Sequence, residues 1–270
     1  MAKTIKDILN TWIIFKGGET GFRQWAAYMQ FKDLTEACLR FELPIAVAGA
    51  SIMFLGSILI ILSRHFILTA VAINCGLWAV CFLLAKLGFI GQREKYLRQY
   101  GKSAYRVAAL RFLLPYAALW WSAASMPLWV PGERAFHLFP FSIFGVIMLV
   151  VVCLLLFKIE AVFGMDRLSF VYSYFPQEAR LVRSQIFGFI RHPVYTTWLY
   201  FAIGIFFIKG SFTSLASVAV NIVAISILAQ EEEKDIIKYF KEDYLVYKKS
   251  VPRFFPKKPV AFLKFLFSSR

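Results

Sequence analysis

Long apolar runs that are almost free of charge restrict the possible folds of this chain more than any other feature. An α-helix needs ~20 residues to cross a bilayer core ~30 Å thick. Inside a bilayer each backbone polar group needs a partner from the chain itself, so such runs fold as helices. We expect membrane spans at Leu43–Leu62, Phe66–Ile90, Phe112–Val130 and Leu138–Phe157.

Two further apolar runs lie close together near the C-terminal end. Val194–Ile208 and Phe212–Ala229 are separated only by Lys209-Gly210-Ser211, which predicts a helical hairpin. The first run has 15 residues and reaches only ~22 Å as a helix, so it is short for a full crossing. The predicted fold class is therefore all-α: a polytopic transmembrane helical bundle of about six membrane helices, the last two forming the hairpin.

The composition agrees with a membrane protein and excludes several other classes. Of the 270 residues 59% are hydrophobic and 17% are charged, an apolar share above that of a soluble domain. The first apolar run begins after 42 mixed residues and is too long for a signal-peptide core. The four cysteines show no CxxC spacing, so we expect neither a disulfide framework nor a metal site.

The basic residues predict the orientation in the membrane, because Lys and Arg accumulate in cytoplasmic segments. Of the 31 Lys and Arg residues, 27 fall in residues 1–42, 91–111, 158–193 and 230–270, and three fall in the alternate connections. Both termini and the polar segments between them are therefore expected in the cytoplasm. Topology and anionic lipid explain the net charge of +15, so we expect no nucleic-acid partner.

We divide the chain into three regions. Residues 1–42 form a cytoplasmic or interfacial segment, residues 43–157 a four-helix membrane region, and residues 158–270 a polar-rich region that contains the hairpin 194–229. In the first region, apolar residues at helical spacing alternate with lysines, which predicts an amphipathic helix on the membrane surface. Its apolar residues are Ile5, Ile8, Leu9, Trp12, Ile13 and Phe15.

Arg191-His192-Pro193 stands directly before the hairpin. Proline is suited to the first position of a helix, because its missing amide hydrogen would have no helical partner there. The free amides of Val194, Tyr195 and Thr196 at the positive end of this helix favour an anionic group. The alternative is a basic cap that only flanks the membrane.

Three consecutive acids, Glu231, Glu232 and Glu233, follow the second leg of the hairpin. Adjacent carboxylates repel one another and need a cation or a basic partner. Because a hairpin returns its second leg beside the start of its first, we expect these acids to lie near Arg191 and His192. The alternative is a solvated run of charges at a helix end.

An amphipathic helix is predicted after the acids, in the cytoplasm. Pro252 ends this helix, and Pro256 and Pro259 are expected to keep the tail extended. Packing is the ordinary role of such an apolar stripe. The stripe consists of Ile236, Phe240, Tyr244, Tyr247 and Val251.

Residues 180–256 carry a string that resembles the isoprenylcysteine carboxyl methyltransferase family. Phospholipid methyltransferases and some bacterial thiol methyltransferases share this signature in looser form. The first 110 residues show no such resemblance. The string consists of Arg191-His192-Pro193-Val194-Tyr195, Trp198, Gly204, Glu232-Glu233, Phe240, Tyr244, Tyr247 and Val251-Pro252.

The resemblance implies an integral membrane methyltransferase that uses S-adenosylmethionine and acts on a lipophilic acceptor: an isoprenylcysteine-like carboxylate, a phospholipid amine or a thiol. The cofactor carries a carboxylate, an ammonium and a sulfonium, so it needs an anion site and acids in one pocket. By analogy the catalytic residues are Arg191, His192 and Glu233. The cofactor-binding residues implied in the same way are Gln185, Phe187, Arg191, His192, Tyr195, Glu232, Glu233, Tyr244 and Tyr247.

This chain departs from the family pattern at several positions. The family has arginines just before the paired acids, whereas residues 226–230 contain none, which weakens the case for a carboxylate acceptor. The family glycines correspond here to Thr197 and Lys241, and both replacements are expected to be tolerated on a helix. Other cations, at Arg180, Arg183 or Arg253, are available to replace the missing arginines.

Two other functions fit the composition. A membrane reductase of the sterol type shares a similar C-terminal architecture and uses NADPH, but paired acids do not suit a dinucleotide phosphate. A transporter or structural membrane protein would carry charged or broken spans near the bilayer midplane, and the spans here are nearly uncharged.

Overall fold

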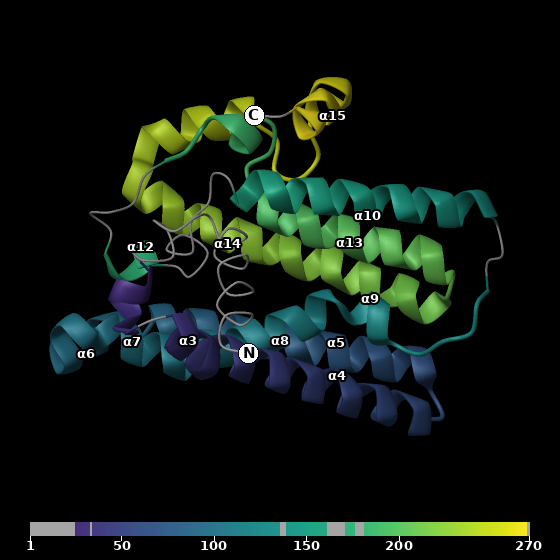
Figure 1. Ribbon diagram of the computed structural model, residues 1–270, viewed down its shortest axis with the longest axis horizontal. Coiled ribbons are helices and arrows are strands. Elements are labelled where there is room, and N and C mark those ends of the chain that lie inside the picture. The colour runs from purple at the N-terminus through teal and green to yellow at the C-terminus, as the bar shows by residue number, and fades with distance from the viewer. Residues whose placement is uncertain (1–24, 33, 136–138, 161–170, 176–180, 269–270) are drawn as a thin grey trace. The chain divides into compact units, whose positions relative to one another are not determined.

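The computed structural model describes residues 25–32, 34–135, 139–160, 171–175 and 181–268 (Figure 1). Every regular element in these ranges is a helix, which confirms the predicted all-α membrane bundle. The amphipathic helix expected from Ile5 to Phe15 lies outside the described residues. The chain forms two compact units that interleave along the sequence, and each is described by itself.

Five helical stretches are long and apolar enough to cross a membrane, and a sixth apolar helix, α13, is shorter. The first predicted span coincides with α4, and the second with α5 and the π-helical turns that follow it. α13 has 17 residues, or about 25 Å of helix. The main helices of these six stretches are α4 (Leu43–Leu62), α5 (Phe66–Leu83) with η2 (Leu84–Ile90), α8 (Leu114–Ala124), α10 (Phe139–Glu160), α13 (Pro193–Lys209) and α14 (Phe212–Ser250).

The third predicted span, Phe112–Val130, is wrong in its boundaries. The helical stretch runs from Arg93 to Ala124, and a turn at Ser125 separates it from the short helix α9 (Met126–Trp129). Pro127 has no amide hydrogen to bond to the carbonyl four residues earlier, which removes a bond that a continuing helix would make and favours the break at Ser125. Shorter helices complete this part of the chain: α3 (Leu34–Ala37), η1 (Cys38–Glu42), α6 (Arg93–Tyr100), η3 (Gly101–Ser103), α7 (Ala104–Ala108), η4 (Ala109–Leu113) and α12 (Val171–Tyr174).

Unit 1 comprises residues 1–52, 79–121 and 160–179. Its helices pack closely at Gly88, where a Cβ atom would lie 2.5 Å from the ring of Phe112. The hydroxyl of Tyr174 donates a hydrogen bond to the carbonyl of Phe89 at 3.1 Å, which ties α12 to the π-helical turns of η2. None of the residues predicted to form the site belongs to this unit.

Unit 2 comprises residues 53–78, 122–159 and 180–270, and it contains the hairpin. α10 and α13 approach closely through two glycines, because a Cβ atom on Gly145 would lie 2.6 Å from the carbonyl oxygen of Gly204. Small residues of this kind let membrane helices pack where no hydrophobic effect drives association. Figure 1 shows α10, α13 and α14 running side by side.

A buried amide network joins the other helices of unit 2 to α14. Asn221 accepts from the Trp78 indole at 2.9 Å and from the Asn74 amide at 3.3 Å, and its own amide donates to the carbonyl of Ala124 at 2.9 Å. In a low-dielectric interior such bonds are strong and unpaired polar groups are costly. The network therefore fixes the rotation of α14 relative to α5 and the end of α8.

The turn of the hairpin follows from two residues. Gly210 ends α13 with a φ of 61°, a left-handed conformation that glycine adopts without a steric penalty. Ser211 then caps α14 by accepting a hydrogen bond from the amide of Ser214 at 3.2 Å. These two residues send the chain straight back, so that the predicted helical hairpin is present.

α14 has 39 residues, about 58 Å of straight helix, and therefore exceeds the bilayer core. Its apolar part is followed by the three acids, and its regular geometry is interrupted at Lys241, where φ is 45° and ψ is −124°. The predicted amphipathic helix is thus the continuation of the membrane helix after a kink. It ends at Ser250, just before Pro252, as expected.

The expectation of an extended tail is wrong for residues 259–267. These residues form α15 (Pro259–Phe267), with Pro259 at its N-terminal end. Proline is compatible with the first turn of a helix, and the apolar residues of this segment have a surface against which to pack. Phe262 and Leu266 are buried, and Phe262 and Phe265 contact the ring of Phe189.

Candidate functional site

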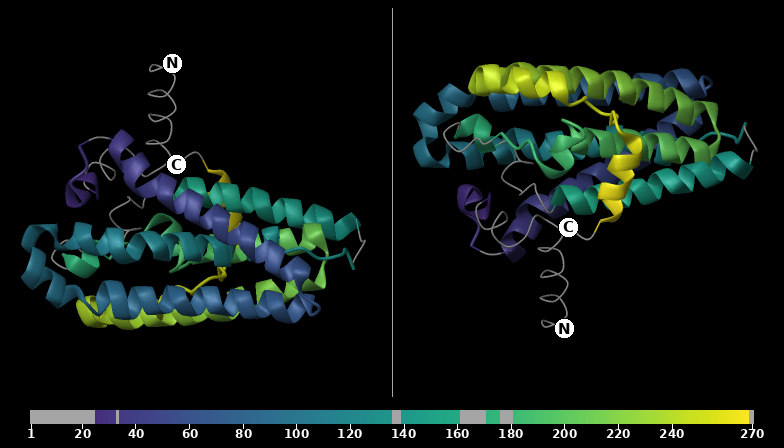
Figure 2. Two further views of the ribbon diagram at one scale, coloured as in Figure 1. Left: turned by 90° about the horizontal axis from the view of Figure 1, so that it is seen from below. Right: turned by 90° about the horizontal axis from the view of Figure 1, so that it is seen from above.

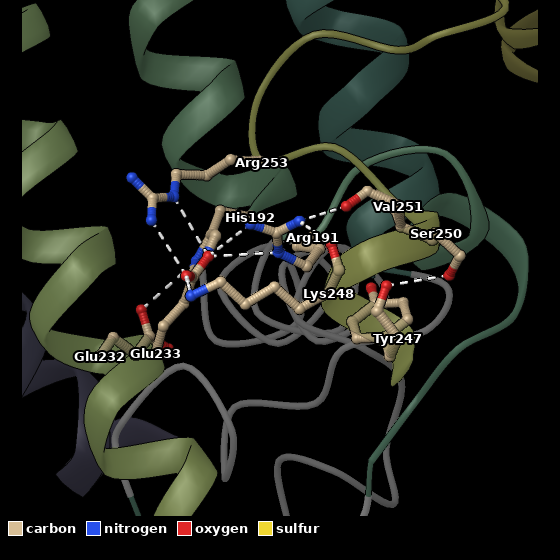
Figure 3. Close-up of polar contacts among 9 residues, drawn as sticks. All are labelled: Arg191, His192, Glu232, Glu233, Tyr247, Lys248, Ser250, Val251 and Arg253. Carbon is tan, nitrogen blue, oxygen red and sulfur yellow. Dashed lines mark hydrogen bonds and ion pairs between the residues drawn. The ribbon is translucent and has the colours of Figure 1, made fainter. Parts of the chain in front are cut away.

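The two ends of the hairpin meet, as the sequence predicts. Arg191 and His192 precede α13, and Glu232 and Glu233 belong to α14. The Arg191 guanidinium lies 2.8 Å from Oε1 of Glu233, and Nε2 of His192 lies 3.2 Å from the same oxygen. Nδ1 of His192 lies 3.6 Å from Oε2 of Glu232. Figure 3 shows these side chains converging on the Glu233 carboxylate.

Glu233 is the centre of the cluster. Its side chain is 1% exposed, and it binds two cations besides Arg191 and His192. Nζ of Lys248 lies 2.9 Å from Oε2, and the Arg253 guanidinium donates to Oε1 at 3.1 Å and to Oε2 at 3.0 Å. A buried carboxylate is stable only with partners of this kind, so Glu233 holds several cations in fixed positions.

The kink at Lys241 makes this arrangement possible. Lys248 follows Glu233 by 15 residues, which would place the two about 22 Å apart along a straight helix. The left-handed backbone at Lys241 instead turns the last part of α14 back, so that Nζ of Lys248 reaches Glu233 at 2.9 Å. Figure 1 shows α14 reversing its direction in this region.

Arg191 also ties the end of α14 to the start of α13. Its guanidinium donates to the carbonyl of Lys248 at 3.0 Å and to the carbonyl of Val251, which satisfies acceptors that the last turn of a helix leaves open. The bonds to these carbonyls and to Glu233 leave its side chain 7% exposed. Arg191 is thus a cross-link within the site as much as a surface for a ligand.

Residues 251–255 form a strap that lies against the start of α13. The amide of Arg191 donates to the carbonyl of Pro252 at 2.9 Å, and the amide of His192 donates to the carbonyl of Arg253 at 3.2 Å. The Thr196 hydroxyl donates to the carbonyl of Phe254 at 3.1 Å. The Thr196 amide, which we expected to be free for an anion, donates to the carbonyl of His192 instead.

His192 is buried between the two acids. Burial by itself lowers the pKa of this imidazole, but its contacts with Glu232 and Glu233 outweigh burial and raise the pKa above its ordinary value of 6.5. The ring of Tyr195 stacks on it with 5.4 Å between centroids and 12° between planes. The two acids therefore favour the protonated form of His192.

The remaining predicted residues lie on both sides of the strap. Tyr244 and Tyr247 are buried and pack with Val251, Phe240 and Ile236, so the predicted stripe is a packing surface. The Tyr247 hydroxyl donates to the carbonyl of Phe187 at 2.7 Å, which joins the turn η6 (Gln185–Gly188) to this surface. Gln185 has a φ of 54° and an exposed side chain.

Glu232 differs from Glu233 in its environment. Its side chain is 26% exposed, and its contact with His192 is an ion pair at 3.6 Å. The Lys248 and Arg253 side chains are also partly exposed, at 39% and 29%. The side chains of the cluster that solvent reaches are thus one carboxylate and two cations.

Three permanent cations and a histidine with a raised pKa face two carboxylates, so the cluster as a whole is positive. Positive clusters of this kind are suited to an anion, and a partly exposed carboxylate such as that of Glu232 is suited to a cation. A zwitterionic ligand with both charges fits this donor set. Within the described ranges, no group of three or more His, Cys, Asp or Glu side chains is arranged to hold a metal ion.

Lys248 and Arg253 are the residues that sequence reasoning missed. Lys248 lies outside the predicted apolar stripe and was given no role, and Arg253 was named only as a replacement for the missing arginines. The signal for Lys248 was Lys241, which stands where the family has glycine. A glycine at that point indicates a backbone conformation that a regular helix does not contain, and the replacement was wrongly expected to be tolerated on a helix.

Comparison with known proteins finds a family similarity in the part of the chain that contains the hairpin. Residues 138–238 match the model of the isoprenylcysteine carboxyl methyltransferase (ICMT) family. No curated protein and no solved structure matches the chain. The matched residues include α10, α13, the paired acids and most of the apolar part of α14. The similarity to the isoprenylcysteine carboxyl methyltransferase family thus covers the hairpin and the paired acids, over residues 138–238 of the chain.

Proposed function

We propose that this chain transfers a methyl group from S-adenosylmethionine to a lipophilic acceptor. The observation that carries the proposal is that the partly exposed side chains of the cluster are one acid, Glu232, and two cations, Lys248 and Arg253. S-adenosylmethionine carries a carboxylate together with an ammonium and a sulfonium. It therefore needs fixed cations and an acid in one place, and these three residues supply them.

The burial of the site residues suggests how they divide the work. Lys248 and Arg253 bind the carboxylate of the cofactor, and Glu232 binds its ammonium. Arg191 and Glu233, with side chains only 7% and 1% exposed, hold those residues in position. Their predicted catalytic role is thus one of positioning.

The other predicted residues close the site. Tyr195 fixes the plane of the His192 ring, and Tyr244 and Tyr247 form the wall beneath it. The turn with Gln185 and Phe187 is joined to this wall through the Tyr247 hydroxyl. We propose that this turn covers the adenosyl side of the cofactor.

The bound cofactor supplies an electrophilic methyl group on its sulfonium. The contribution of the chain is to align the acceptor with that methyl group and to exclude water. A carboxylate acceptor needs no base, whereas an amine or a thiol has to lose a proton. Glu232 is positioned to accept that proton, because its side chain is 26% exposed, whereas the two acids favour the protonated form of His192.

The membrane supplies the acceptor. Isoprenylcysteine-like carboxylates, phospholipid amines and lipophilic thiols all place their polar group at the membrane surface while their apolar part stays in the bilayer. The distribution of basic residues favours a hairpin mouth on the cytoplasmic side. We therefore propose that the acceptor enters from the cytoplasmic leaflet.

Cofactor titration tests this proposal. The protein, purified in mild detergent, is titrated with S-adenosylmethionine and, separately, with NADPH, which a sterol-type reductase would bind. A charged hydrogen bond contributes ~1.5–3 kcal/mol, so Arg253→Gln and Glu232→Gln each weaken binding by about 10- to 100-fold.

Arg183→Gln is the matched control. It removes the same charge from a side chain that pairs with the exposed Asp243 at 2.9 Å, outside the cluster. It is expected to leave the affinity unchanged. Binding of NADPH in place of S-adenosylmethionine by the folded protein would refute the proposal, and so would equal affinities for all three variants.

A further inference from the structure

The surface of α15 is apolar on two sides, and only one of them is covered. Phe262 and Leu266 point into unit 2 and are buried. The opposite stripe, at positions i, i+3 and i+7, consists of Val260, Leu263 and Phe267, which are 66%, 42% and 68% exposed. A helix that is apolar on both sides is typical of burial in protein or in lipid.

The position of α15 favours lipid over protein as the cover of its exposed stripe. The helix lies at the end of α10, where Nζ of Lys158 donates to the carbonyl of Ser268 at 2.6 Å and lies 4.9 Å from the centre of the Phe265 ring. Figure 2 shows α15 running across the direction of α10 and α13. Since those helices are membrane spans, a helix that crosses their direction at their end lies in the plane of the membrane surface.

The exposed stripe continues a surface that already faces lipid. α10 is apolar along its length, and its exposed residues include Val150, Leu156 and Phe157 at 48%, 46% and 57%. Phe157 is next to Lys158, which contacts α15. The lipid-facing side of α10 and the stripe of α15 are therefore parts of one apolar surface.

The charges around α15 match an anionic lipid surface. Lys257 and Lys258 precede the helix and Lys264 lies on it, and all three are exposed. Among residues 253–268 the charged side chains are all basic: Arg253, Lys257, Lys258 and Lys264. An amphipathic helix with lysines beside a Phe- and Leu-rich face is the pattern of an interfacial helix, and each Lys near an anionic surface adds ~1 kcal/mol of attraction.

We propose that α15 is an interfacial helix that inserts Val260, Leu263 and Phe267 into the bilayer surface and binds anionic lipid headgroups through Lys257, Lys258 and Lys264. This anchor fixes the C-terminal end of the strap at residues 251–255, whose carbonyls accept hydrogen bonds from the start of α13. The membrane thereby helps to hold the segment that carries Arg253.

Spin labels on single cysteines test this inference in the full chain. The four native cysteines are replaced by alanine, and a nitroxide is attached in turn at Val260→Cys, Leu263→Cys and Phe267→Cys. All three positions report on the depth of α15 in the membrane surface, so if one variant fails to fold, the other two still test the inference. The matched control is Lys249→Cys, an exposed position on the last turn of α14.

The labelled proteins are placed in lipid nanodiscs of phosphatidylcholine alone or with phosphatidylglycerol. In the anionic discs the labels at 260, 263 and 267 collide several-fold more with oxygen than with a water-soluble nickel chelate, and the label at 249 shows the reverse. In phosphatidylcholine discs, or with Lys257, Lys258 and Lys264 changed to Gln, the three labels move toward water.

Three results would overturn the inference. In the first, the labels on α15 would be as accessible to the nickel chelate as the control label. In the second, their depth would be the same in both kinds of disc. In the third, they would broaden one another's spectra because a second copy of the chain covers the stripe. All three readouts are independent of cofactor binding, so they do not depend on the proposed methyltransferase activity.

Discussion

Replacing Glu233 by glutamine should destabilise the protein strongly, because this carboxylate holds four cationic side chains. It accepts two hydrogen bonds from Arg191 at 2.8 and 3.2 Å, and it contacts His192, Lys248 and Arg253. Glutamine preserves the volume of the side chain and removes its charge. The substitution thus leaves the cations facing an amide in a buried place.

The magnitude follows from the exposure of each partner. Arg191 is 7% exposed, and removal of one member of a buried ion pair costs about 3–5 kcal/mol. His192 can lose its proton, and Lys248 and Arg253 can return to water, so that each adds no more than ~0–1 kcal/mol. We expect a total loss of about 3–8 kcal/mol, which at roughly 2–4 °C per kcal/mol lowers the unfolding midpoint by about 6–32 °C.

The assay is thermal unfolding in mild detergent at one scan rate, because the midpoint of an irreversible transition depends on the rate. Glu232→Gln is the matched control, since it makes the same chemical change on the neighbouring residue. Its side chain is 26% exposed and its contact with His192 is 3.6 Å, so the expected loss is ~0–1 kcal/mol. Equal shifts for the two variants would refute the central role of Glu233.

Three further predictions concern the backbone, helix packing and pH. Lys241→Gly removes the steric strain of a side chain at a left-handed position and raises the free energy of unfolding by about 1 kcal/mol. Lys238→Gly, in regular helix, lowers it by a similar amount. Equal thermal shifts for the two variants would contradict the kink. In Gly145→Ala the new Cβ atom lies 2.6 Å from a backbone carbonyl oxygen, which lowers the free energy of unfolding by about 1–3 kcal/mol. In the control Gly76→Ala the new Cβ atom meets no atom within 4 Å, so that this variant is neutral or stabilising. Similar unfolding midpoints for the two variants would contradict the packing of α10 on α13. The pKa of His192 is raised on folding, so its stabilisation is complete below about pH 6.5 and is lost as pH rises through the folded pKa. The difference in midpoint between wild type and His192→Gln should shrink from pH 6 to pH 8.5, and a constant difference would contradict it.

The spans and the hairpin were predictable because they depend on local properties. A run such as Leu43–Leu62 has to form a helix in lipid whatever its neighbours are, and the observed bounds of α4 are those predicted. The turn at Gly210-Ser211 brings the start of α13 beside the acids of α14, so the contact between His192 and Glu233 follows from chain geometry. Local signals thus determined the membrane architecture and half of the site.

The other half of the site depended on contacts that no local signal records. At Lys241 the sequence favours a continuous helix, whereas the kinked backbone is stabilised by tertiary contacts such as the pairing of Lys248 with Glu233. Arg253 belongs to a strap whose carbonyls bond to residues about 60 positions earlier. Such bonds become available only when the chain is folded.

The sequence by itself determined that this protein lies in a membrane, that its last two spans form a hairpin, and that Arg191 and His192 meet the paired acids. These features follow from hydrophobicity, from turn residues and from charges that need partners. Tertiary structure decided which acid is buried and which is exposed, because burial depends on what the kinked end of α14 and the strap place around each carboxylate. It also turned the tail after Pro259 into a helix, since the apolar side chains of that segment are buried only against the rest of unit 2.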